Sequence, residues 1–162
     1  MSNITAEGGL ALAPPGIRTL VRIVAAGAAG LVVWEGFARL IAPATFGFTP
    51  DPTGLIAIAF GVTGMAAMLL HIATGLVAFP AGYVLVVQPV LRAIAPGLPW
   101  IAVGVAYGVA LWVFAMYGMA SLLGGMPPFM GFEPIAWASL IGHVGLGLGI
   151  AFVAARMPGD AA

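Results

Sequence analysis

Charged residues in this 162-residue chain cluster at the ends of four long apolar runs. The chain has five basic and five acidic side chains, and hydrophobic residues make up 62% of it. An apolar stretch of about 20 residues crosses the hydrocarbon core of a bilayer as a helix, because a helix satisfies its backbone polar groups internally. The sequence therefore predicts an all-α integral membrane protein, built as a bundle of four transmembrane helices.

The four runs divide the chain into predicted helices and two tails. Pro80 lies inside the second run, which is longer than a bilayer requires, and a proline removes one backbone donor from a helix. We therefore expect a kink or a break near residue 80. The predicted helices cover about residues 17–41, 55–91, 100–123 and 135–157, with an N-terminal tail at 1–16 and a C-terminal tail at 158–162.

The first run also has some features of a cleaved signal peptide. Two arginines precede its apolar core, and Ala42-Pro43-Ala44 has the small-residue form of a cleavage site. We expect the run to be retained as a helix. It is too long for a signal peptide, and Glu35 and Arg39 lie where a cleavage region is neutral.

The distribution of arginine predicts the orientation of the chain. Asp51, Glu133 and Arg39 fall on one side of the four crossings, and the other four arginines fall on the opposite side. Cytoplasmic loops of multi-pass membrane proteins carry an excess of arginine and lysine. Both termini are therefore predicted to be cytoplasmic, in a bacterial inner membrane. The four arginines are Arg18, Arg22, Arg92 and Arg156.

Composition argues against several classes of function. No basic segment offers a surface for nucleic acid. The chain has no cysteine, which excludes disulfides, thiolate metal ligands and cysteine nucleophiles. No other nucleophile stands in a motif with a base and an orienting group. Enzyme activity is therefore not expected.

Two short sequence segments indicate an internal repeat. The segment His71–Leu76 (HIATGL) is similar to His143–Leu148 (HVGLGL), and a Gly-Phe pair precedes each of the two runs. Two tandem helical hairpins of equal orientation would explain both matches; chance similarity between apolar segments is the alternative. Two G-x-x-x-G motifs predict close helix packing within the chain, with contact to another chain as the alternative. The motifs are Gly104 with Gly108 and Gly145 with Gly149.

His71 and His143 are the titratable side chains predicted to lie deepest in the hydrocarbon, where ionisable groups are candidates for function. Two neutral imidazoles on facing helices can ligate one haem b iron. Measured from the midpoints of their runs, the two histidines lie at similar depth. Measured from the acidic residue in each preceding loop, their positions differ by about ten residues, or about 15 Å.

Other roles for these and neighbouring residues stay open. Each histidine could instead bond a hydroxyl such as that of Thr74 or Ser139, or belong to a proton or quinone site. Glu35 and Arg39 are four residues apart and are predicted to form an ion pair on one helix face. Four methionines offer thioethers for Cu(I), although methionine is also an ordinary core residue. These are Met116, Met119, Met126 and Met130.

Several sequence features taken together form a pattern. They are the H-x-x-x-G motifs at His71 and His143, the expected Pro80 break, Trp112 in the third run and the outer loop rich in Pro, Gly and Phe. Over residues 17–156 this pattern resembles a group of small four-helix bacterial inner-membrane proteins of unknown function. The resemblance implies the four-span fold and no particular activity.

Two functions of different classes follow as expectations. The first is a non-catalytic accessory subunit or scaffold, which packs its glycine-rich helices against a larger, respiratory-type membrane complex or against a second copy of itself. The alternative is a small electron-transfer protein that binds haem b through His71 and His143.

Overall fold

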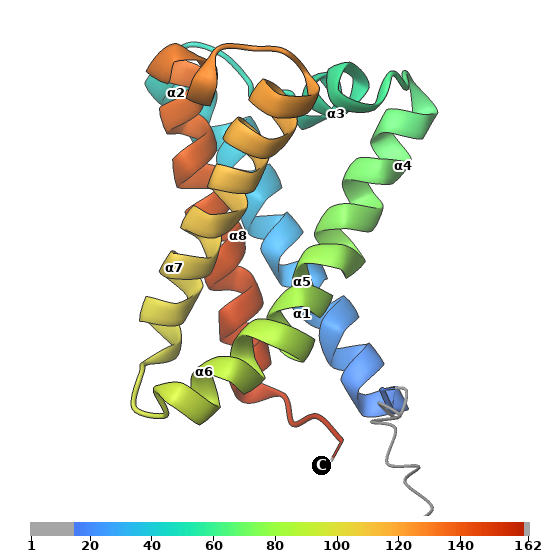
Figure 1. Ribbon diagram of the computed structural model, residues 1–162, viewed down its shortest axis with the longest axis vertical. Helices are drawn as coiled ribbons and strands as arrows, with labels where there is room; N and C mark the ends of the chain where they lie inside the picture. The colour runs from blue at the N-terminus through green and yellow to red at the C-terminus, as the bar shows by residue number, and fades with distance from the viewer. Residues whose placement is uncertain (1–14, 161–162) are drawn as a thin grey trace, which may run out of the picture.

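The computed structural model describes residues 15–160 of the chain (Figure 1). Within this range the chain is helical, without strands, and four of its helices are long and apolar enough to span a membrane. Four such helices are consistent with a multi-pass membrane protein, which the apolar runs predict.

Four long helices and two short helical segments make up the fold. The first long helix comprises α1 (Ile17–Gly36), η1 (Phe37–Ile41) and α2 (Ala42–Phe46). After the short helix α3 (Pro52–Phe60), the second comprises α4 (Met65–Ala73), η2 (Thr74–Ala78), α5 (Phe79–Gly82), η3 (Tyr83–Val87) and α6 (Gln88–Ile94). The third comprises α7 (Trp100–Val113) and η4 (Phe114–Leu123), and a short 3₁₀ turn, η5 (Pro128–Phe132), leads to the fourth, α8 (Pro134–Arg156).

The bundle has two distinct ends. We call the end that holds α3, η5 and their flanking loops the loop end, and the opposite end the terminal end (Figure 1). At the terminal end, the Thr19 N–H donates to the Asp160 carboxylate at 3.0 Å. The start of α1 and the segment after α8 therefore lie together.

The second apolar run is interrupted ahead of α4, and near Pro80 it changes direction without ending, which is the kink that was one of the two expected outcomes. Gly61 and Gly64, both with positive φ, separate α3 from α4, whereas the helix continues through Pro80 to Ile94. Positive φ costs glycine little because it has no Cβ. The sequence prediction emphasised proline and overlooked this glycine pair. Figure 1 shows that the helix changes direction between α4 and α6 but does not end there.

Three prolines are accommodated by π-helical turns. The turns η1, η2 and η3 end two residues before Pro43, Pro80 and Pro89, respectively. A proline has no N–H, and its ring clashes with the carbonyl four residues earlier in an α-helix. A wider π turn relieves this clash. The same effect extends the first helix to Phe46, past the end predicted near residue 41.

Helix α8 lies at the centre of the bundle and contacts both α1 and α7. Its backbone approaches these helices closely because glycines line both contacts. A Cβ at Gly108 would overlap the backbone of His143, and a Cβ at Gly149 would overlap the backbone of Gly30. The glycines of both G-x-x-x-G motifs thus contact helices of the same chain, Gly104 against α8 and Gly145 against Val33 of α1.

A buried arginine joins three helices near the terminal end. Arg22 is 6% exposed, and its Nη2 donates to Gln88 Oε1 at 2.6 Å and to the Ala154 carbonyl. The sequence analysis counted Arg22 only as a flanking positive charge. A buried guanidinium is stable here because polar groups of α6 and α8 accept its hydrogen bonds.

Helix α4 leans away from α8 towards the loop end, and α3 lies across the opening between them (Figure 1). Helix α4 contacts the bundle through α3, and the next turn of the same span, η2, packs against α1. The two helical hairpins of the possible repeat differ in their connections. The first hairpin has the helix α3 before its second long helix, and the second hairpin has only the turn η5 there. The fold leaves an internal space beneath α3.

Candidate functional site

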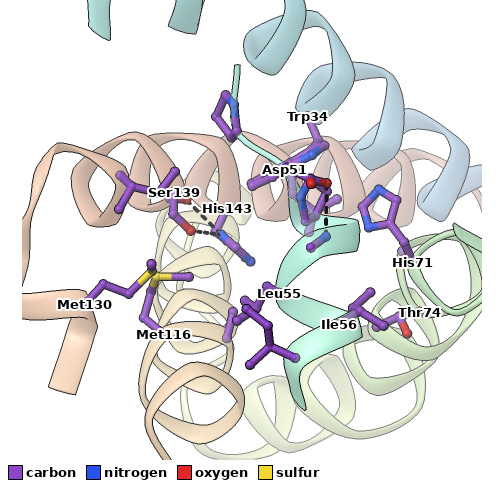
Figure 2. Close-up of a pocket in the computed structure, with 18 of the residues that line it drawn as sticks. Trp34, Asp51, Leu55, Ile56, His71, Thr74, Met116, Met130, Ser139 and His143 are labelled. Atoms are coloured by element: carbon purple, nitrogen blue, oxygen red, sulfur yellow. Dashed lines mark hydrogen bonds between the residues drawn. The ribbon is translucent and has the colours of Figure 1, made fainter. Parts of the chain in front are cut away.

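A cavity of about 410 Å³ lies beneath α3 at the loop end (Figure 2). Its walls come from α1, α4, η2, η4 and α8. Most of the lining is apolar, and the side chains that can bond or ligate a guest are few. These are Trp34, Thr49, Asp51, His71, Thr74, Met116, Met126, Met130, Ser139 and His143.

The cavity brings together the two histidines that the sequence singles out. His71 lies six residues after the start of α4, and His143 lies nine residues after the start of α8. The difference of three residues corresponds to about 4.5 Å along a helix. The two sequence-based measures of depth disagreed because α3 was counted as part of the second span.

His143 has a fixed orientation. The residue is 8% exposed, and its Nδ1 lies 2.8 Å from the Ser139 carbonyl and 3.2 Å from Ser139 Oγ. A carbonyl can only accept, so Nδ1 carries a proton, and in the neutral imidazole the acceptor nitrogen is Nε2. The Trp34 ring packs edge-on against the imidazole, with 4.8 Å between ring centroids. His143 is therefore held in one orientation, with Nδ1 bonded to Ser139.

His71 faces a different partner. Its Nε2 lies 3.6 Å from Glu35 Oε1, and Arg39 Nε lies 2.6 Å from Glu35 Oε2. The Glu35–Arg39 pair expected on one helix is thus extended by a histidine from α4. The three side chains form a polar chain from the exposed guanidinium of Arg39 to the cavity wall.

Asp51 is a cavity residue that the sequence analysis did not select. Its Oδ1 accepts hydrogen bonds from the backbone N–H of Thr53 and Gly54, at 3.0 and 3.1 Å, and from the Thr53 hydroxyl at 2.6 Å. These bonds cap α3, and they lower the pKa of Asp51, the Thr53 hydroxyl having the largest effect. The Asp-Pro-Thr motif is a helix-start signature that could have identified this role.

Three of the four methionines singled out in the sequence line the cavity: Met116, Met126 and Met130. Met119 instead packs with Ile56 in a separate cluster. Figure 2 shows Met116 and Met130 on the His143 side of the cavity, with His71 and Thr74 on the other side. The structure thus distinguishes methionines that face the cavity from one that fills the core.

Unusual backbone conformations surround the methionine side of the cavity. Met130 has a φ of 53°, and its neighbour Phe129 has a φ of 51°. Met116 lies on η4, a π-helical segment of ten residues. Left-handed non-glycine residues and π-helical turns are both found often at functional sites.

The chemistry of the lining limits what the cavity can bind. Among the described residues that line it, Asp51 is the one carboxylate, and none is arginine or lysine. The lining therefore favours a neutral or cationic guest over an anionic one.

The comparisons with known proteins add no assignment. The chain matches no protein-family model, no curated protein and no solved structure. The site is therefore interpreted from its own residues.

We expect Asp51 to stabilise α3 over the cavity. Replacing Asp51 with Ala should cost about 1 kcal/mol of local stability, because two backbone N–H groups lose their acceptor. Hydrogen exchange of the α3 amides should become faster. Glu133→Ala is the matched control, because Glu133 occupies the same position before α8 but makes no side-chain cap hydrogen bond.

This cap should also depend on pH. Because folding lowers the pKa of Asp51, its stabilising effect is complete above the ordinary value of 3.8 and is lost as the pH falls through the lower folded-state value. Protection of α3 should fall in that acidic range in the wild type and not in Asp51→Ala. Equal exchange in both proteins at neutral pH would contradict the capping role.

Proposed function

We propose that this protein is a non-catalytic component of the membrane that binds a ligand in the loop-end cavity and acts within a larger membrane complex. The observation that carries the proposal is that His71 and His143, from two different helices, line one cavity. Ionisable side chains within a membrane-spanning helix cost folding free energy, so where they occur they usually serve a function.

An unpartnered polar atom supports the binding role. Nε1 of Trp34 is buried without a hydrogen-bond partner among the described residues, and the Trp34 side chain lines the cavity. Buried polar atoms in native proteins almost always have a partner. A bound guest with an acceptor atom would supply that partner.

The pairing of Ser139 with His143 supports a non-catalytic role. A serine nucleophile needs a neighbouring base that accepts its proton. Here the nearby nitrogen, Nδ1 of His143, donates to the Ser139 carbonyl, so it is not free to act as that base. The Ser139 hydroxyl is therefore better suited to holding the imidazole than to attacking a substrate.

Uneven burial supports the accessory role. Only 22% of the most apolar 18 residues of Met65–Ile94 are buried within the chain, against 56% for Pro134–Arg156. A large apolar face of the second span is therefore left to contact lipid or another subunit, including a second copy of this chain.

We place the terminal end on the cytoplasmic side of a bacterial inner membrane. Arg18, Arg22, Arg92 and Arg156 belong to that end of the bundle, whereas Asp51 and Glu133 belong to the loop end. Under the positive-inside rule, the cavity then lies in the outer half of the bilayer.

Native mass spectrometry of tagged protein, extracted from its host membrane in mild detergent, tests this proposal. We expect species heavier than the single chain by a partner subunit, together with a bound ligand that His143→Ala releases. The partner should remain with the variant, because His143 is 8% exposed and lies inside the chain. A ligand-free single chain from gently extracted membranes would contradict the proposal.

One observation favours a second function, haem b binding for electron transfer. Both predicted axial ligands line the same cavity, as a bis-histidine site requires. Two features argue against it, because Nε2 of His71 faces Glu35 and the described lining supplies no arginine or lysine for the haem propionates.

A reduced-minus-oxidised visible spectrum, with a pyridine haemochrome assay, tests the haem hypothesis. Haem held by both histidines should give a b-type α-band at about one haem per chain, and His71→Ala or His143→Ala should remove it. A flat spectrum from folded protein prepared with an intact haem supply would eliminate this candidate.

A further inference from the structure

The methionine side of the cavity is not used by the haem hypothesis. Met116 comes from η4, Met126 from the loop after it and Met130 from η5, and all three line the cavity together with His143 of α8. Met130 packs against the apolar cluster that contains Met116. Segments that are separate in sequence thus bring three thioethers and one imidazole to one space.

This set of donors selects for a particular kind of metal ion. Thioether sulfur is a soft ligand that favours Cu(I), whereas Mg²⁺, Ca²⁺ and Mn²⁺ prefer oxygen and Zn²⁺ prefers thiolate, imidazole and carboxylate. Within residues 15–160, no group of three His, Asp or Glu side chains is arranged to hold a metal ion. A hard or borderline divalent ion therefore lacks a ligand set here.

His143 makes a hydrogen bond of the kind that metal-binding histidines make. Such histidines commonly donate their other ring N–H to a carbonyl or carboxylate, which fixes the ring and its tautomer. The Ser139 carbonyl has this role at 2.8 Å from Nδ1. In the neutral imidazole, Nε2 is then the nitrogen that binds a metal.

The electrostatics of the cavity favour a monovalent cation. Burying a charge in apolar surroundings is costly, and the cost is smaller for one charge than for two. The Asp51 carboxylate is part of the lining, on the side of Trp34 and His71 (Figure 2), and the described lining adds no arginine or lysine. One carboxylate is enough to balance a single positive charge.

We propose that Met116, Met126, Met130 and His143 bind one Cu(I) ion in the loop-end cavity. The inference rests on the proposed ligand-binding role and names its ligand class. It is an alternative to haem, since both would use His143. Placing the ion on the side away from His71 leaves the Glu35–His71 pair intact.

Anaerobic competition with a chromophoric Cu(I) chelator tests the proposal on the purified full-length protein in detergent. We expect the wild type to withdraw one equivalent of Cu(I) from the chelator. Met116→Leu, Met130→Leu and His143→Ala should each weaken binding by at least the roughly 10- to 100-fold that is lost when a residue supporting a metal ligand is changed. Met119→Leu is the matched control, because Met119 packs in another cluster, and its affinity should be unchanged. Methionine-to-leucine changes conserve volume and should preserve the fold, which size-exclusion chromatography checks.

X-ray absorption of the Cu(I) protein provides the second measurement, with sulfur and nitrogen neighbours expected in the wild type. A wild type that leaves all Cu(I) with the chelator, or equal affinities in Met116→Leu and Met119→Leu, would overturn the proposal. If native mass spectrometry still shows a partner and a ligand that His143→Ala releases, the copper proposal alone fails. If native mass spectrometry of gentle extracts shows a ligand-free single chain while the purified protein binds Cu(I), the proposed role in a ligand-binding membrane complex fails. The Cu(I) site itself would then still be supported.

Discussion

The need of every backbone polar group for a hydrogen-bond partner, within helices this apolar, is the constraint on which the rest of the structure depends. Each N–H and C=O inside a bilayer needs a partner within the protein, so a span cannot simply break where a proline occurs. The chain meets this requirement with a π-helical turn ahead of Pro43, Pro80 and Pro89. The true break, at Gly61 and Gly64, lies at the loop end, where α3 turns across the bundle.

That break determines where the candidate site forms. With α3 removed from the second span, His71 lies six residues after the start of α4 and lines the same cavity as His143. Helix α3 covers the cavity, and its cap residue Asp51 adds a carboxylate to the lining. The break at two glycines with positive φ thus separates the cover of the cavity from the helix that carries His71.

The sequence predicted the four spans well, because uninterrupted apolar runs leave few alternatives. It selected His71 and His143 from their depth alone and had no means of deciding whether they share a cavity. It missed Arg22 as a buried group, because the acceptors at Gln88 and Ala154 are distant in sequence. It also grouped Met119 with the cavity methionines, since only tertiary packing separates them.

The central claim is that His71 and His143 face one cavity. The chain has no native cysteine, so cross-linking of His71→Cys/His143→Cys with a short bifunctional thiol reagent in membranes tests the claim directly. We expect this pair to cross-link and the control pair His71→Cys/Ala151→Cys to remain unlinked, because Ala151 lies deeper on α8 against Gly104. If a monofunctional reagent labels positions 71 and 143 but the bifunctional one does not join them, the shared cavity is contradicted.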